Sequence, residues 1–212
     1  NINLSIFNKE NAATTVASTI SIASKFQIRF FATGGIGGVH LNAENTNDVS
    51  ADLYALSENS NFVICSGAKS ILDLSKTNEL LETLGITRIG YQTNYMPGFW
   101  YEETENKVDN KFDEIHEISS FLKLNENMGN KKSILIFNKV PLEKALNKND
   151  VEKWINNATI KADRNNISGK ELTPFLIKEI NEQSKNETLN ANVSLIINNA
   201  NLAGKIAKSF YS

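Results

Sequence analysis

Lys69 is the residue whose position most directly suggests covalent chemistry. It follows an apolar run at residues 61–65 and three small residues at 66–68. We predict a helix over residues 68–84, closed by Gly85, which places Lys69 in the first turn. The positive end of a helix dipole and burial both disfavour an ammonium ion there, and a neutral amine can form a Schiff base with a sugar aldehyde. An ordinary solvated lysine is the alternative, and the local pattern taken alone favours it.

A glycine cluster at residues 33–40 (TGGIGGVH) is the second candidate. It matches neither the dinucleotide fingerprint, since His40 occupies the third glycine position, nor a P-loop, since no Gly-Lys-Ser/Thr follows. Its backbone amides could hold an anion, with the Thr33 hydroxyl and the His40 imidazole at the edges. The alternative is a tight turn between a strand and a loop.

Asp48 and Asp52 are four residues apart at the expected start of a helix over residues 49–58, so we expect them to share a face. One could bind a hard divalent cation and the other a substrate hydroxyl. The alternative is that Asp48 caps the helix and Asp52 complements its dipole. Asn192, on the apolar last helix, could read a base edge with its amide or simply be one of many asparagines.

Alternating strand-like and helix-like segments must position these side chains. Strands are predicted at 27–32, 61–65, 87–91 and 133–137, and helices at 13–25, 49–58, 68–84, 113–124, 149–163, 171–183 and 189–210. Short apolar strands between helices are typical of an α/β domain with a largely buried sheet. Residues 1–7 alternate polar and apolar like a strand entered midway.

The composition excludes several functional classes. The chain has 212 residues, of which 41% are hydrophobic and 22% charged, and a net charge of −2. No apolar run reaches the ~18 residues of a membrane span, and no basic excess supports binding of nucleic acid. A single cysteine, Cys65, excludes a disulfide framework and fits a reducing, cytoplasmic location.

Seven segments, in order along the chain, together resemble the pseudouridine-5′-phosphate glycosidase family, which includes indigoidine-synthesis-type proteins. The most specific are FATGGIGGVH (residues 31–40), DVSADL (48–53) and SGAKSILDL (66–74). The others are ATTVAST, GYQT, GKELTPFL and NANVSLIINNA at residues 13–19, 90–93, 169–176 and 190–200.

The resemblance implies a fold, a reaction and a set of roles. The expected fold is α/β, with a mixed central β-sheet flanked by helices in α/β/α layers. The expected reaction is reversible cleavage of the C–C glycosidic bond of pseudouridine 5′-phosphate to uracil and ribose 5-phosphate. By matched motif, Lys69 is the Schiff-base nucleophile and Asp48 binds one Mn²⁺. The positions implied to bind substrate are Val16, Thr33, His40, Ser50, Ala51, Asp52 and Asn192.

The resemblance also implies a homotrimer and places two functional residues outside this sequence. The family's proton-donating glutamate and a second substrate-binding lysine lie in a segment N-terminal to Asn1. We therefore expect one domain over residues 1–212 that is N-terminally incomplete. The alternative function is a non-catalytic remnant of the same fold that binds a sugar phosphate or nucleotide.

Overall fold

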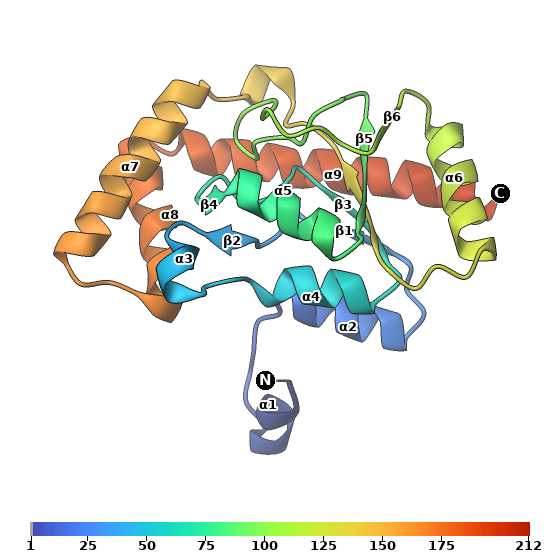
Figure 1. Cartoon of the computed structure of the whole chain (residues 1–212), viewed down its shortest axis with the longest axis horizontal. Helices are drawn as coiled ribbons and strands as arrows, with labels where there is room; N and C mark the ends of the chain where they lie inside the picture. Colours follow the sequence, from blue (N-terminus) through green and yellow to red (C-terminus); the bar gives the residue numbers. More distant parts are fainter. Residues whose placement is uncertain (1) are drawn as a thin grey trace.

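A five-stranded sheet forms the centre of the molecule in a computed structural model that describes residues 2–212 (Figure 1). Its strands lie in the order β1, β3, β7, β5, β6. Their bounds are Phe30–Ala32, Phe62–Cys65, Ile134–Phe137, Thr87–Tyr91 and Asn110–Phe112. The four residues of β3, and likewise those of β7, are all buried. Strands covered on both faces read as continuous apolar runs, which is why these two were visible in the sequence.

The five-stranded sheet is not mixed, as we had expected it to be, because every strand pairing in it is parallel. Parallel neighbours require long crossovers, and long segments separate consecutive strands here. Antiparallel pairing occurs instead in a separate two-stranded sheet of β2 (Val39–His40) and β4 (Leu72–Asp73). That small sheet sets His40 opposite Leu72.

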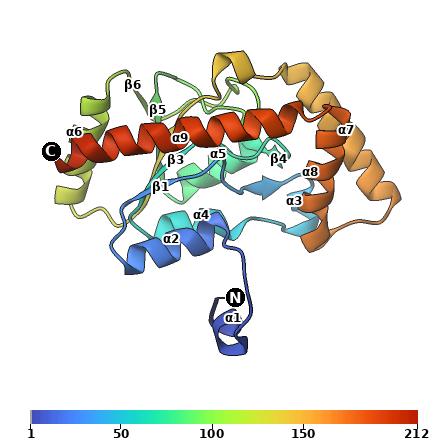
Figure 2. The same ribbon diagram turned by 180° about the vertical axis from the view of Figure 1, so that it is seen from behind.

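Helices cover both faces of the sheet, as expected for α/β/α layers. Val63 and Cys65 point to the face covered by α2 (Val16–Lys25), α4 (Ala51–Glu58) and α5 (Leu74–Thr83). Phe62 and Ile64 point to the face covered by α6 (Ile115–Asn127) and the C-terminal half of α9 (Glu187–Tyr211). Figure 2 shows α9 running along the whole molecule. The two faces of one strand therefore belong to two apolar cores.

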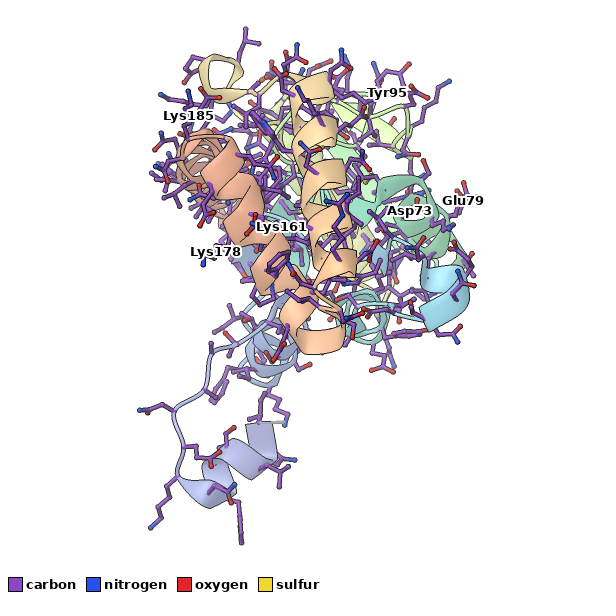
Figure 3. All side chains as sticks on the ribbon, turned by 90° about the vertical axis from the view of Figure 1, so that its left-hand side faces the viewer. Asp73, Glu79, Tyr95, Lys161, Lys178 and Lys185 are labelled. Atoms are coloured by element: carbon purple, nitrogen blue, oxygen red, sulfur yellow. The ribbon has the colours of Figure 1, made fainter. Side chains whose placement is uncertain are left out.

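A helical pair closes one end of the molecule. α7 (Lys148–Arg164) packs against α8 (Leu172–Gln183), and Lys161 donates to the Glu179 carboxylate across the pair at 2.6 Å (Figure 3). The remaining short helices are α3 (Ala43–Thr46) and the 3₁₀ helices η1 (Leu142–Lys144) and η2 (Gly169–Glu171). No helix within residues 2–212 combines the length and apolar character needed to span a membrane.

The two largest differences between predicted elements and the structure concern residues 68–84 and residues 1–7. The helix predicted over residues 68–84 begins at Leu74, because residues 72–73 are taken up by β4 and Asp73 caps the helix by accepting from the Lys76 amide. It does end at Gly85, whose φ of +67° favours glycine. The strand-like pattern at residues 1–7 is helical over Ile2–Asn8 (α1), with Asn1 outside the described residues.

α1 projects from the body on an extended linker, and none of its described residues is buried (Figure 1). Leu4, Ile6 and Phe7 are 58%, 71% and 84% exposed. With no neighbouring strand to pair with, the segment satisfies its backbone groups internally as a helix.

Candidate active site

The glycine turn after β1 and the segment that carries Lys69 after β3 lie side by side at the carboxyl edge of the sheet. Backbone hydrogen bonds join them from the Ser66 amide to the Gly34 carbonyl (2.8 Å) and from the Lys69 amide to the Ile36 carbonyl (3.1 Å). The parallel pairing of β1 with β3 thus continues beyond both strands. Ligands of open α/β sheets bind at this edge, so the structure supports the glycine turn as part of a site.

Asp52 holds the far side of the glycine turn. Its carboxylate is 5% exposed and accepts from the Gly37 amide at 2.7 Å and from the Ala17 amide, near the start of α2, at 2.8 Å. A Cβ on Gly37 would collide with the Ser50 hydroxyl, which explains why this position requires glycine. Asp52 therefore joins α2, α4 and the turn.

Asp48 lies outside α4, so the expectation that it shares a helix face with Asp52 is wrong. The helix begins at Ala51, and its N-cap is Ser50, whose hydroxyl accepts from the Asp52 amide. Asp48 instead lies beside His40: the His40 amide donates to the Asp48 carbonyl at 3.0 Å, and the imidazole Nδ1 is 3.9 Å from the carboxylate. The Asp48 side chain is 42% exposed and free to meet a ligand.

Lys69 is half-buried and lies in the loop before β4, five residues ahead of α5. The predicted helix-dipole effect on its amine is therefore absent. Its side chain lines a cavity of about 110 Å³ together with Asn192. The other walls are Ile71, Phe99, Trp100 and Ile177. The structure thus brings together two predicted residues that are 123 positions apart in the sequence (192 − 69).

The remaining predicted residues border the same edge. Thr33 is the first residue after β1, and its amide donates to the Ile64 carbonyl at 3.0 Å. Val16 opens α2 behind the cap Thr15 and packs on the core, and Ala51 opens α4 with an exposed side chain. The predicted set therefore falls into two groups, one around Asp48 and Asp52 and one around Lys69 and Asn192, joined through residues 36–38.

Three further residues belong to this edge. Phe99 and Trp100 lie in the aromatic loop at residues 95–101, which the sequence led us to expect at the pocket rim or at a subunit interface, and both line the cavity. Asn199 is fully buried; its Nδ2 donates to the Thr33 carbonyl at 2.8 Å, and its Oδ1 accepts from the side-chain Nδ2 of Asn138 at 3.0 Å. Cys65 is no nucleophile at this site, because full burial raises the pKa of its thiol to about 12.

A metal ion at this site would have few protein ligands. Within residues 2–212 no group of three histidine, cysteine or acidic side chains is placed to hold a metal. Both carboxylate oxygens of Asp52 are engaged by backbone amides, which leaves Asp48 as the available carboxylate, with His40 beside it. This donor set fits a hard cation that keeps most of its water ligands.

Comparison with known proteins finds relatives over nearly the whole of this chain. The family model described as "Indigoidine synthase A like protein" matches residues 1–209. Pseudouridine-5′-phosphate glycosidases of Petrotoga mobilis and Escherichia coli are 47% and 41% identical over 94% and 95% of this chain. The chain spans 65% and 64% of the lengths of those two relatives.

Two solved structures share the fold. The prealnumycin C-glycosynthase AlnA, in complex with ribulose 5-phosphate, superposes with a TM-score of 0.88 at 33% identity, over 93% of this chain and 65% of AlnA. An indigoidine synthase A-like protein from Thermotoga maritima superposes with a TM-score of 0.85 at 36% identity, over 93% of this chain and 64% of its own. Both confirm the predicted α/β architecture.

Proposed function

This chain belongs to the indigoidine synthase A-like family, and we propose that it acts on the C–C glycosidic bond of pseudouridine 5′-phosphate, interconverting it with uracil and ribose 5-phosphate. The observation that carries the proposal is the cavity shared by Lys69 and Asn192, which places an amine and an amide together at the carboxyl edge of the sheet. The complex of AlnA with a pentose phosphate supports a sugar phosphate as ligand.

Lys69 is the proposed nucleophile because a C–C bond has no ready leaving group. Its Nζ lone pair bonds to C1′ of the sugar while the ring C1′–O4′ bond breaks and O4′ takes a proton. The positively charged nitrogen then releases one proton and regains a lone pair. That lone pair forms a C=N bond as the bond from C1′ to uracil breaks, and the uracil carbon takes a proton. Water hydrolyses the imine, which releases ribose 5-phosphate and returns the amine.

In this proposal the two groups of residues bind different parts of the substrate, one the base and the other the sugar phosphate. Asn192 and the aromatic walls receive the base near Lys69. The sugar phosphate is received beside the glycine turn by Thr33, His40 and Ser50, because the turn is buried and its amides at Ile36, Gly37 and Val39 already donate within the chain. The walls around the sugar phosphate also include Val16, Ala51 and Asp52. Asp52 acts by accepting hydrogen bonds from the backbone amides of Ala17 and Gly37 and does not contact the substrate directly.

A Mn²⁺ ion held by Asp48 is part of the proposal. When bound, it would supply positive charge next to the oxygens of the sugar phosphate. The exposed Asp48 carboxylate supports this role, since the chain's own contacts leave it available.

Product formation by the purified chain tests the function. Uracil release from pseudouridine 5′-phosphate is measured chromatographically for the unaltered chain, Lys69→Ala, and a control, Lys178→Ala, on the exposed surface of α8. We expect release by the unaltered chain and the control and none by Lys69→Ala. Binding of ribose 5-phosphate without any turnover would instead favour the non-catalytic alternative.

Metal binding is tested separately from turnover. We expect Mn²⁺ titrations followed by electron paramagnetic resonance to show one site, and Asp48→Asn to weaken it at least tenfold. Asp113→Asn, at an exposed acid far along the chain, is the control. Equal Mn²⁺ affinity of Asp48→Asn and the unaltered chain would refute the role of Asp48.

A further inference from the structure

Trp100 holds the amide of Asn192 in one orientation. The indole Nε1 donates to the Asn192 Oδ1 at 2.7 Å, across 92 residues of sequence. An indole N–H can only donate, so the amide must present its oxygen to Trp100 and its NH₂ group elsewhere. The chemistry of the tryptophan thereby fixes which end of the asparagine remains available.

The Asn192 NH₂ group is the free end. No acceptor for Nδ2 is found within the described part of the chain, and no buried side-chain nitrogen or oxygen there lacks a partner. Nδ2 is therefore accessible rather than enclosed, and Asn192 lines the same cavity as Lys69. A group entering that cavity therefore lies beside Asn192, whose NH₂ group is available to donate.

The indole is itself firmly placed. Trp100 is 2% exposed, its ring packs on Phe99 at 5.4 Å between centroids, and its carbonyl accepts from the Leu146 amide at 2.8 Å. The Ser70 hydroxyl, next to Lys69, donates to the Gly98 carbonyl at 2.6 Å and anchors the loop. Trp100 is thus positioned from several elements before any ligand arrives.

We propose that Trp100 is a positioning residue that makes Asn192 a dedicated donor, so that the cavity selects a planar ring bearing a carbonyl oxygen. The inference rests on the proposed function, in which that ring is uracil. Apolar walls on the remaining sides suit the faces of the ring. The cavity volume of about 110 Å³ is of the same order as the volume of one small planar ring.

Uracil binding to the full chain tests the proposal by isothermal titration without ribose 5-phosphate, so that no turnover contributes heat. Trp100→Phe keeps an aromatic ring but removes the N–H donor, and we expect it to raise the Kd for uracil about tenfold. Asn192→Leu should do the same, and the double variant should be no weaker than Asn192→Leu alone, because both remove one interaction. Trp154→Phe on α7 replaces the other tryptophan and is the matched control.

A second readout separates this inference from the proposed function. Reductive trapping of ribose 5-phosphate on Lys69 does not involve the base, so it is measured on the unaltered chain and on Trp154→Phe, and we expect equal rates; circular dichroism and urea denaturation check that Trp100→Phe folds. Unchanged uracil affinity in Trp100→Phe, additive losses in the double variant, or no uracil binding by the unaltered chain would overturn the inference. Loss of trapping by the unaltered chain with uracil binding intact would instead count against the proposed function alone.

Discussion

At the scale of single residues, Asp52 illustrates how a side chain can serve a site without meeting the ligand. The sequence suggested a substrate contact or a helix-dipole partner, and its position in the first turn of α4 agrees with the second. Its two oxygens also accept from amides of the glycine turn and of α2, which no local pattern indicates. Its carboxylate thereby sets the distance between three segments.

We predict that Asp52→Asn lowers the free energy of unfolding by about 1–3 kcal/mol, because an NH₂ group would face one of the two backbone N–H donors. Urea denaturation measures the change. Asp150→Asn, an exposed acid in the first turn of α7, is the matched control and should cost under about 0.5 kcal/mol. Equal costs for the two variants would show that the buried hydrogen bonds of Asp52 contribute nothing.

At the scale of elements, local patterns predicted most strands and helices but not the contacts between them. Residues 87–91 and the last helix were predicted nearly to their ends, because periodicity and capping are encoded in neighbouring residues. The start of α5 was wrong because β4 forms by pairing with β2, over 30 residues earlier. The hydrogen-bond partners of Trp100 and Asn199 were not predictable for the same reason, since those partners are distant in the sequence.

Asn199 provides the prediction at this scale. It joins α9 to the carboxyl ends of β1, β3 and β7 through Thr33, Ser66 and Asn138. Asn199→Asp loses the hydrogen bonds that Nδ2 donates to Thr33, Gly34 and Ser66 and buries a carboxylate. We therefore expect a loss of ~3 kcal/mol in unfolding free energy by urea denaturation. Asn201→Asp, exposed on the same helix, should be nearly neutral. An Asn199→Asp variant with the same unfolding free energy and the same thermal unfolding midpoint as the unaltered chain would show that these hydrogen bonds do not hold α9 to the strands.

At the scale of the whole molecule, the layered body and the projecting α1 contribute unequally to stability. α1 buries no described residue, and its short length cannot stabilise it alone. We predict that deleting residues 1–8 changes the unfolding free energy by less than about 0.5 kcal/mol, measured by urea denaturation. A loss above about 2 kcal/mol would mean that this segment packs on the body in solution.

The expected homotrimer stays a prediction at this scale. An apolar stripe on α9, formed by Leu189, Val193, Ile196 and Ile197, is about half exposed and available for contact. Light scattering should give about three times the 23.5 kDa of one chain. A monomeric mass at micromolar concentration would contradict the expectation.

Covalent capture of the sugar on Lys69 is the most direct test of the whole account. The chain is incubated with ribose 5-phosphate and sodium borohydride, and peptide mass spectrometry locates the adduct. The account predicts one adduct on Lys69, retained in Lys178→Ala and absent in Lys69→Ala. An adduct spread over exposed lysines, or none on Lys69 while the sugar phosphate still binds, would contradict it.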